Sequence, residues 1–279
     1  MPDLSSAAAE KLLAGITIPP RPSVVTAVME ERAKTDPNPG RIAQLIANDV
    51  GLSAAVLKTI NSPFYGLRRR IASIDEAVAL LGMKNIGTLV IGHSLSGAIP
   101  SKGLERFWDS AARTALIASH LAKTLGAVSR EDAHLLGLFH DCGIPLLLDR
   151  FPDYKVTLQL ANNERSRSFT DVEDERHGTN HSVVGALLAA NWKLPTHIRD
   201  AIANNHDLGI FGSSMPSEVL NLIATVHIAE YIENSYSRLS TDCEWEKQGV
   251  AVMTQLMIDE ESVEEMARDA VEMIERSGL

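Results

Sequence analysis

The stretch EDAHLLGLFHDCGIPLLL, residues 131–148, sets a histidine and an aspartate, His140 and Asp141, in a segment that is otherwise almost wholly apolar. Imidazole and carboxylate both bind divalent cations, and burying an aspartate without a partner costs much free energy. Apolar residues before the pair recur at helical spacing, and Gly143 and Pro145 then interrupt the pattern. We therefore expect a buried helix that ends or kinks after Asp141, with a metal ion, an arginine or a hydrogen-bond network against the pair.

A second His-Asp pair, His206 and Asp207, occurs in a different setting, so the dipeptide alone does not define a site. Adjacent side chains on a helix point about 100° apart, so His140 and Asp141 can share a cation only near the helix end. The other ligands must then come from distant parts of the chain. Without a cation, the pair would be hydrogen-bonded groups that cap a buried helix end.

The composition indicates an ordinary globular protein. The chain has 279 residues, 45% of them hydrophobic, and a net charge of −10, which gives no general attraction to nucleic acid or to an anionic membrane. Its two cysteines, Cys142 and Cys243, are widely separated and form no CxxC motif, which argues against a zinc ribbon or a disulfide framework. The N-terminus lacks the pattern of a signal peptide and no run of 18 apolar residues occurs, so we expect a cytoplasmic protein.

The apolar residues recur at helical spacing in nearly every segment longer than ten residues, which predicts an all-α fold. Gly82 is expected to close one helix, and His181 and Pro195 to start others. The polar segment RSRSFTDVEDERHGTNH, residues 165–181, is expected to be a loop or a mobile insertion with short helical pieces. Further helices are expected at residues 4–15, 24–33, 41–48, 52–61, 107–125, 132–141 and 153–163, with a final amphipathic helix opened by Ser262.

Six polar side chains that interrupt apolar helical segments form a candidate metal site. They offer only nitrogen and oxygen ligands, the mixture expected for Fe, Mn, Zn or Mg. His181, near a helix N-terminus, is expected to be biased toward the neutral form that coordinates a metal. The alternatives are a backbone-bonded His181, an exposed His206, and solvated or salt-bridged acidic residues. The six are Asp109, His140, Asp141, His181, His206 and Glu230.

The order of several motifs resembles the HDOD family, bacterial regulatory relatives of the HD-domain metal-dependent phosphohydrolases and of the HD-GYP cyclic-dinucleotide phosphodiesterases. The matching segments span about residues 16–232 and include IPPRPSVV, INSPFYG, SIDEAVALLG, LLGLFHDCGIPLLL and IATVHIAEYIE. The resemblance implies an HD-like helical bundle packed against an N-terminal helical subdomain. It divides the chain into an N-terminal half (1–103), an HD-like half (104–232) and a C-terminal helical extension (233–279).

The resemblance also implies a ligand pattern, and this chain keeps only part of it. The His-Asp pair falls on His140 and Asp141, the next histidine on His181, and the second member of a histidine pair on His206. Where active relatives have a first histidine, the start of the histidine pair and a last aspartate, this chain has Asp109, Asn205 and Glu230. A GYP motif is missing. Binding of one cation is compatible with these changes, whereas they disfavour a two-metal hydrolase.

The three consecutive arginines Arg68, Arg69 and Arg70 form the only basic triplet in the chain. Their guanidinium groups suit a phosphate, a nucleotide or an acidic partner surface, although a solvated loop would carry the same charges. The chain lacks a kinase, receiver or DNA-binding motif, so we expect its output to pass through partner proteins in signalling.

Three functions remain open from the sequence. The first is an HDOD-type signal-transduction module, catalytically degenerate, that acts by binding partners or a ligand. The second is a metal-dependent phosphohydrolase acting on a nucleotide or other phosphoester, with Asp141 as a catalytic residue. The third is an interaction adaptor with an empty pocket. The missing ligands favour the first.

Overall fold

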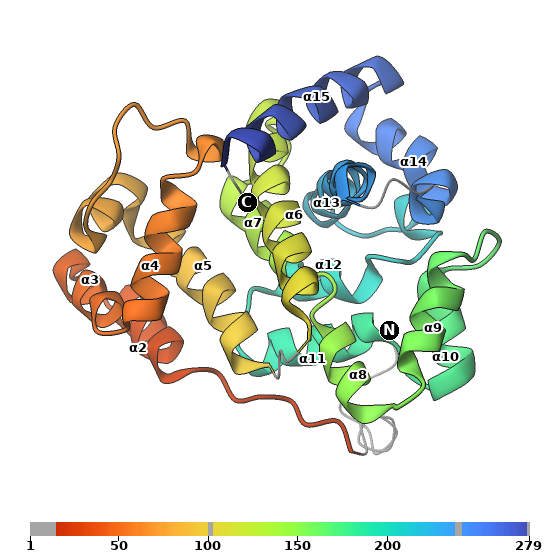
Figure 1. Cartoon of the computed structure of the whole chain (residues 1–279), viewed down its shortest axis with the longest axis horizontal. Helices are drawn as coiled ribbons and strands as arrows, with labels where there is room; N and C mark the ends of the chain where they lie inside the picture. The colour runs from red at the N-terminus through yellow and green to blue at the C-terminus, as the bar shows by residue number, and fades with distance from the viewer. Residues whose placement is uncertain (1–14, 100–102, 238–241, 278–279) are drawn as a thin grey trace.

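A computed structural model of the chain describes residues 15–99, 103–237 and 242–277. Within those ranges the regular elements are all helices and none is a strand, which confirms the expected all-α fold (Figure 1). The helix expected at residues 4–15 lies outside the described residues.

The first part of the bundle, on the left in Figure 1, consists of three short helices, a 3-10 turn and one long helix, and three of these helices begin at a polar side chain. Asn38, Asp49 and Ser73 each accept a hydrogen bond from a backbone N–H in the first turn of the helix that follows. Such caps satisfy donors that the helix itself cannot pair. The elements are α2 (Ser23–Arg32), α3 (Pro39–Ala47), α4 (Val50–Ile60), the 3-10 turn η1 (Pro63–Tyr65) and α5 (Ile74–Ala98).

The helix α5 bends at Gly82, where φ is 73° and ψ is 167°, so the first of its two segments ends where expected. Glycine adopts this conformation without the steric cost that other residues have. Among the described residues, α5 is the one helix long and apolar enough to cross a membrane, but half of that apolar window is buried inside the protein. It packs against α3, α4 and α7, which identifies it as a core helix.

The centre of the bundle is the pair α6 (Glu105–Leu125) and α7 (Arg130–Phe139), which pack closely on each other. Gly137 permits this approach, because a Cβ at that position would lie 2.6 Å from Cα of Ala115. α7 ends at Phe139, two residues before the expected end at Asp141, and a new helix starts at Gly143. The His-Asp pair therefore sits in the turn between two buried helices.

The remaining helices surround this central pair. α13 packs against α6, α12 and α14, and the last helix returns to contact η1 and α6. These elements are α8 (Gly143–Arg150), α9 (Tyr154–Asn162), α10 (Phe169–His177), α11 (His181–Asn191), α12 (Thr196–Asn204), the 3-10 turn η2 (Ile210–Gly212), α13 (Ser217–Ser237), α14 (Cys243–Leu256) and α15 (Glu260–Ser277).

The segment expected to be a loop or a mobile insertion with short helical pieces contains the nine-residue helix α10. Ser168 and Asp171 form a reciprocal capping box at its start. Phe169 and Val172 pack with Ala161 of α9 in a small apolar cluster. The charged composition of the segment conceals these apolar contacts, which hold the helix against α9.

The C-terminal extension is helical, but its last helix begins earlier than expected. Asp259, rather than Ser262, accepts the capping hydrogen bond, from the backbone N–H of Ser262 at 2.9 Å. The helix α13 continues past residue 232 to Ser237, so the expected boundary at 232 falls inside a helix. The division of the chain into three parts stays a prediction.

The buried histidine His134 on α7 is expected to make the protein acid-sensitive. The side chain is 4% exposed, and burial lowers its pKa to about 3. An unfolded histidine titrates near 6.5, so the unfolded state gains a proton first, and stability is lost as the pH falls from about 6.5 toward 3. Between pH 7 and pH 4 this residue should cost about 3 kcal/mol.

The measurement is urea unfolding at pH 7 and pH 4 for the wild-type protein and for His134→Leu. The variant should lose less stability than the wild type over this interval, because leucine binds no proton in either state. An equal loss in both proteins would contradict the assignment of this acid sensitivity to His134.

Candidate metal centre

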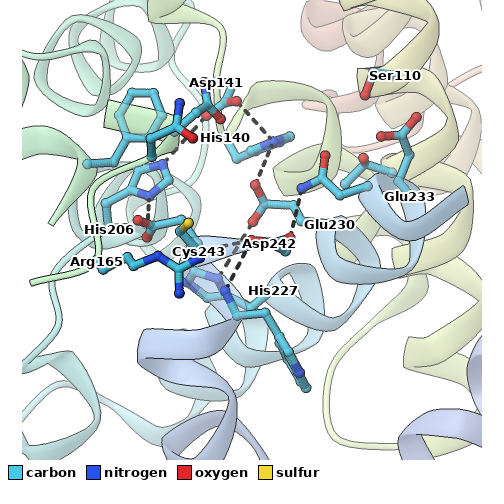
Figure 2. A pocket seen from close by; sticks show the side chains of 17 residues that line it. Ser110, His140, Asp141, Arg165, His206, His227, Glu230, Glu233, Asp242 and Cys243 are labelled. Carbon is cyan, nitrogen blue, oxygen red and sulfur yellow. Dashed lines mark hydrogen bonds and ion pairs between the residues drawn. The ribbon is translucent and has the colours of Figure 1, made fainter. Parts of the chain in front are cut away.

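The turn between α7 and α8 orients His140. Its Nδ1 lies 2.8 Å from the carbonyl oxygen of Gly137, one turn earlier, and donates a proton to it. The other ring nitrogen, Nε2, is then directed toward Asp141 and Glu230 (Figure 2). The helix end therefore presents one imidazole nitrogen to a cavity, while the backbone fixes the ring.

Asp141 lies at the centre of the candidate site. Its Oδ1 is 3.2 Å from Nε2 of His181 and 3.7 Å from Nε2 of His206, and its Oδ2 is 3.6 Å from Nε2 of His140. His181 is the first residue of α11 and His206 follows the end of α12. The expected convergence of ligands from separate helices is thus present in the structure.

Glu230 on α13 completes a second group. Its Oε1 is 3.3 Å from Nε2 of His140, and its Oε2 is 3.7 Å from Nδ1 of His227. Around Asp141, two sets of three side chains can each gather their ligand atoms within 4.8 Å: Asp141, His181 and His206, and His140, Asp141 and Glu230. Because Asp141 belongs to both, five of the six predicted residues form one continuous cluster.

The remaining predicted residues lie elsewhere. Asp109 is exposed on α6 and lines a surface hollow beside His140 and Asp141, outside both ligand groups. Asn205, which stands where a relative would have a ligand, is fully buried, and its backbone carbonyl accepts a 2.7 Å hydrogen bond from Nε2 of His227. The arginines 68–70 are exposed in the loop before α5, where Arg69 pairs with Glu76.

Three residues of the site were not predicted from the sequence. Glu173 on α10 holds His181, Glu244 on α14 lies 3.2 Å from Nδ1 of His206, and His227 contacts Glu230. His227 precedes Glu230 by three residues, a spacing that places both on one helix face, and could have been found. Glu173 and Glu244 lie among many other acidic residues of charged segments, which gave no signal.

The carboxylates of the cluster dominate the titration of its histidines. Burial lowers the pKa of His140, but Asp141 and Glu230 outweigh this effect and raise it to about 9. Burial also lowers the pKa of His181, but Glu173 and Asp141 outweigh this effect and raise it to about 10. The expected bias of His181 toward the neutral form is therefore wrong for the metal-free protein, because two carboxylates outweigh the helix dipole.

The same balance acts on His206 and Asp141. Burial lowers the pKa of His206, whereas Asp141 and Glu244 raise it to about 9. Burial alone would raise the pKa of Asp141, but the neighbouring histidines, His140 foremost, hold it well below its usual range. Without a metal, protons on the imidazoles neutralise the buried carboxylates.

Several buried polar atoms fit a cation at this position. Within the described part of the chain, Oδ1 of Asp141, Nε2 of His206 and Oε2 of Glu230 are buried and make no hydrogen bond of good geometry. Their nearest charged neighbours are other members of the cluster and His227, at 3.2 to 3.7 Å. Buried polar atoms are normally paired, so nitrogen and oxygen atoms left unpaired within one buried cluster indicate a missing partner. Imidazole nitrogens and carboxylate oxygens suit Fe, Mn or Zn, and the donor set therefore fits a divalent metal.

A cavity of about 360 Å³ opens beside the cluster (Figure 2). Its wall combines the metal-ligand candidates with residues from α6, from α13, from the start of α14 and from the loop between α9 and α10. Among them are Ser110, Arg165, Glu233, Asp242 and Trp245. The candidate cation position is therefore accessible to a small molecule.

The ion pair between Arg113 and Glu233 supports the cavity wall. Nε and Nη2 of Arg113 lie 3.0 and 2.7 Å from Oε1 of Glu233, whose side chain is only 1% exposed. Arg113→Ala would leave this carboxylate buried without its counter-charge and should lower the free energy of unfolding by about 3–5 kcal/mol. Denaturant unfolding measures this loss.

The matched control is Arg69→Ala, which breaks the exposed pair with Glu76. Those side chains are 72% and 40% exposed, so the loss should be about 0–1 kcal/mol. Equal losses in the two variants would contradict a structural role for the buried pair.

Known proteins resemble this chain in sequence and in fold. Residues 18–208 match the HDOD domain. An uncharacterized protein of Treponema pallidum (strain Nichols) is 29% identical over 215 residues, which is 76% of this chain and 41% of that protein. The chain thus spans about two fifths of the length of this relative.

Two solved structures from Shewanella amazonensis SB2B have a similar fold. One, provisionally named a phosphohydrolase, has a TM-score of 0.71 at 24% identity and covers 98% of this chain and 97% of its own. The other, provisionally named a metal-dependent phosphohydrolase, has a TM-score of 0.69 at 16% identity and covers 98% and 99%. At these identities the similarity concerns the fold alone.

Proposed function

The chain belongs to the HDOD family, and from this premise we propose that it is a signal-transduction module that binds one divalent cation and has no strong hydrolase activity of its own. The observation that supports the proposal is the position of Asp141, which is shared by two groups of potential ligands. Three of these residues, Asp141, His206 and Glu230, each have a buried atom that makes no hydrogen bond. The module would transmit its state by contact with signalling proteins.

The residues that would hold the cation are His140, Asp141, His181, His206 and Glu230. When bound, a divalent cation supplies positive charge that polarises an oxygen of a ligand. The protein's own groups orient the imidazoles, exclude solvent from their buried faces and carry protons in the absence of metal. Because the histidines must lose protons to bind a metal, uptake should release protons and strengthen as the pH rises.

The positions of Asp109 and Asn205 support a single cation over a pair. Two-metal hydrolysis requires ligands for both ions. Asp109 is exposed, and Asn205 offers an amide in place of an imidazole. We infer that the remaining donors hold one ion. A second positive charge that would stabilise a leaving oxygen would then be absent.

A metal-dependent phosphohydrolase is the second candidate. The cavity beside the cluster favours it, since Asp141 and the guanidinium of Arg165 both line this cavity and a phosphoester needs an accessible metal and a positive group. In that case Asp141 would be the catalytic residue. A third function, an adaptor with an empty pocket, would use the exposed arginines 68–70 as the contact for an acidic partner.

Metal analysis followed by a phosphodiesterase assay separates these functions. The purified protein is stripped with a chelator, reloaded with Fe, Mn, Zn or Mg, and assayed on a chromogenic phosphodiester. One bound ion per chain without turnover supports the signalling module. Turnover that Asp141→Ala abolishes supports the hydrolase, and absence of metal with a melting temperature unchanged by chelator supports the adaptor.

A further inference from the structure

The histidine His181 has both ring nitrogens occupied by carboxylates. Its side chain is completely buried, with Nε2 3.2 Å from Oδ1 of Asp141 and Nδ1 2.7 Å from Oε2 of Glu173. Only Nε2 faces the cluster of candidate ligands. The nitrogen on the opposite side of the ring is therefore held by Glu173, which is not one of the candidate ligands.

Glu173 is built into the fold by three donors. Its Oε2 accepts from Nδ1 of His181 and from the backbone N–H of the same residue at 3.3 Å, and its Oε1 accepts from the hydroxyl of Tyr154. The carboxylate has no exposed surface. A buried carboxylate is tolerated when its lone pairs are used in this way. Its position is thus fixed by α9, α10 and the start of α11.

The ring of Phe169, four residues before Glu173 on α10, contacts both neighbouring histidines. Its centroid lies 5.3 Å from that of His181, edge to face, and 5.3 Å from that of His206. These contacts restrict the rotation of the two imidazoles. One face of α10 therefore lies against the rear of the cluster, with an acceptor for one histidine and an apolar surface for both.

We propose that Glu173 is a positioning residue for the cation site: it holds the Nδ1 proton of His181 and so presents Nε2 of that ring to the metal, with Tyr154 fixing the carboxylate. This inference rests on the proposed binding of a divalent cation. A metal-binding imidazole whose other nitrogen donates to a carboxylate is fixed in tautomer and orientation and is a stronger ligand. Loss of such a partner typically weakens metal binding about 10–100-fold.

The test compares three variants of the full chain by the dissociation constants for Zn²⁺ and Mn²⁺. Glu173→Gln keeps the shape of the side chain and removes its charge, and should weaken binding about 10–100-fold. Glu175→Gln, on the same helix, is the matched control, because the Glu175 side chain is 64% exposed and pairs with Arg167. It should bind each metal as the wild type does.

Tyr154→Phe distinguishes a positioning role from a structural one. It removes a donor to Glu173 and should lower the melting temperature, but it leaves the contact between Glu173 and His181 in place. Its metal affinity should therefore fall much less than that of Glu173→Gln at a similar loss of stability. If affinity falls in both variants in proportion to stability, the proposed positioning role is wrong.

A nitrogen-15 NMR spectrum of the Zn²⁺-loaded wild type gives a second readout that does not depend on a variant. The His181 ring should carry its proton on Nδ1 and bind zinc through Nε2. Zinc on Nδ1, or unchanged affinity in a folded Glu173→Gln protein, would overturn the inference while leaving the cation site standing. A wild-type protein that takes up no metal would overturn the proposed function itself.

Discussion

Asp141→Ala is expected to weaken the binding of a divalent cation by more than about 100-fold, beyond the loss typical of a residue that only orients a ligand. Asp141 belongs to both groups of candidate ligands, and its two oxygens face the ring nitrogens of three histidines. Alanine removes a negative ligand and leaves the imidazoles without their common acceptor. Titration with Mn²⁺ and metal analysis after gel filtration measure the effect.

The thermal stability of the same variant provides an independent measurement. A ligand present at 100 times its dissociation constant stabilises a protein by about 2.7 kcal/mol, so metal should raise the melting temperature of the wild type and not that of Asp141→Ala. Asp207→Ala is the matched control, since it alters the other His-Asp pair at an exposed residue whose Oδ1 caps the N–H of Gly209. Metal binding by Asp141→Ala equal to that of the control would contradict the proposed site.

Gly143→Ala is expected to destabilise the protein strongly and to disturb the cation site with it. A Cβ at Gly143 would overlap the carbonyl oxygen of His181 and lie 2.8 Å from its carbonyl carbon. Both atoms belong to backbone, so the start of α8 would have to move away from the start of α11. Overpacking in a core costs about 1–3 kcal/mol or more, and the upper part of that range applies where backbone must move.

Denaturant unfolding and metal titration measure the two effects of Gly143→Ala. The control is Gly97→Ala on α5, where a Cβ would meet nothing within 4 Å. That substitution should be neutral or stabilise the helix by up to about 1 kcal/mol, because alanine has the higher helix propensity. Wild-type stability in Gly143→Ala would show that the two helix starts can separate at little cost.

The sequence was sufficient for the all-α fold and for most helix positions. Helical spacing, capping residues and Gly82 act within a few residues of one another, and the sequence records such short-range patterns directly. The charged segment 165–181 was the main exception. Its helix α10 depends on a capping box and on two apolar residues packed against α9, which composition alone does not reveal.

The sequence also identified most, but not all, of the residues of the candidate site correctly. The sequence identified His140 and Asp141 at a helix end, and His181, His206 and Glu230 as polar residues in other apolar helical segments. The structure brings these five together. The sequence also placed Asp109 in this set, although the side chain is exposed outside both ligand groups. Whether an acidic residue faces a cluster or solvent depends on the rotation of its helix against neighbours.

The sequence by itself therefore determined the helices, the family and the central His-Asp pair of this protein. Only the tertiary structure decided that Glu173 supports His181, that Glu244 supports His206 and that Asp109 stands apart. The physical reason is the separation along the chain of the residues that interact. Helix formation is governed by residues up to four apart, whereas an ion pair between α10 and α11 or between α14 and the end of α12 exists only once packed helices fix their side chains at hydrogen-bond distance.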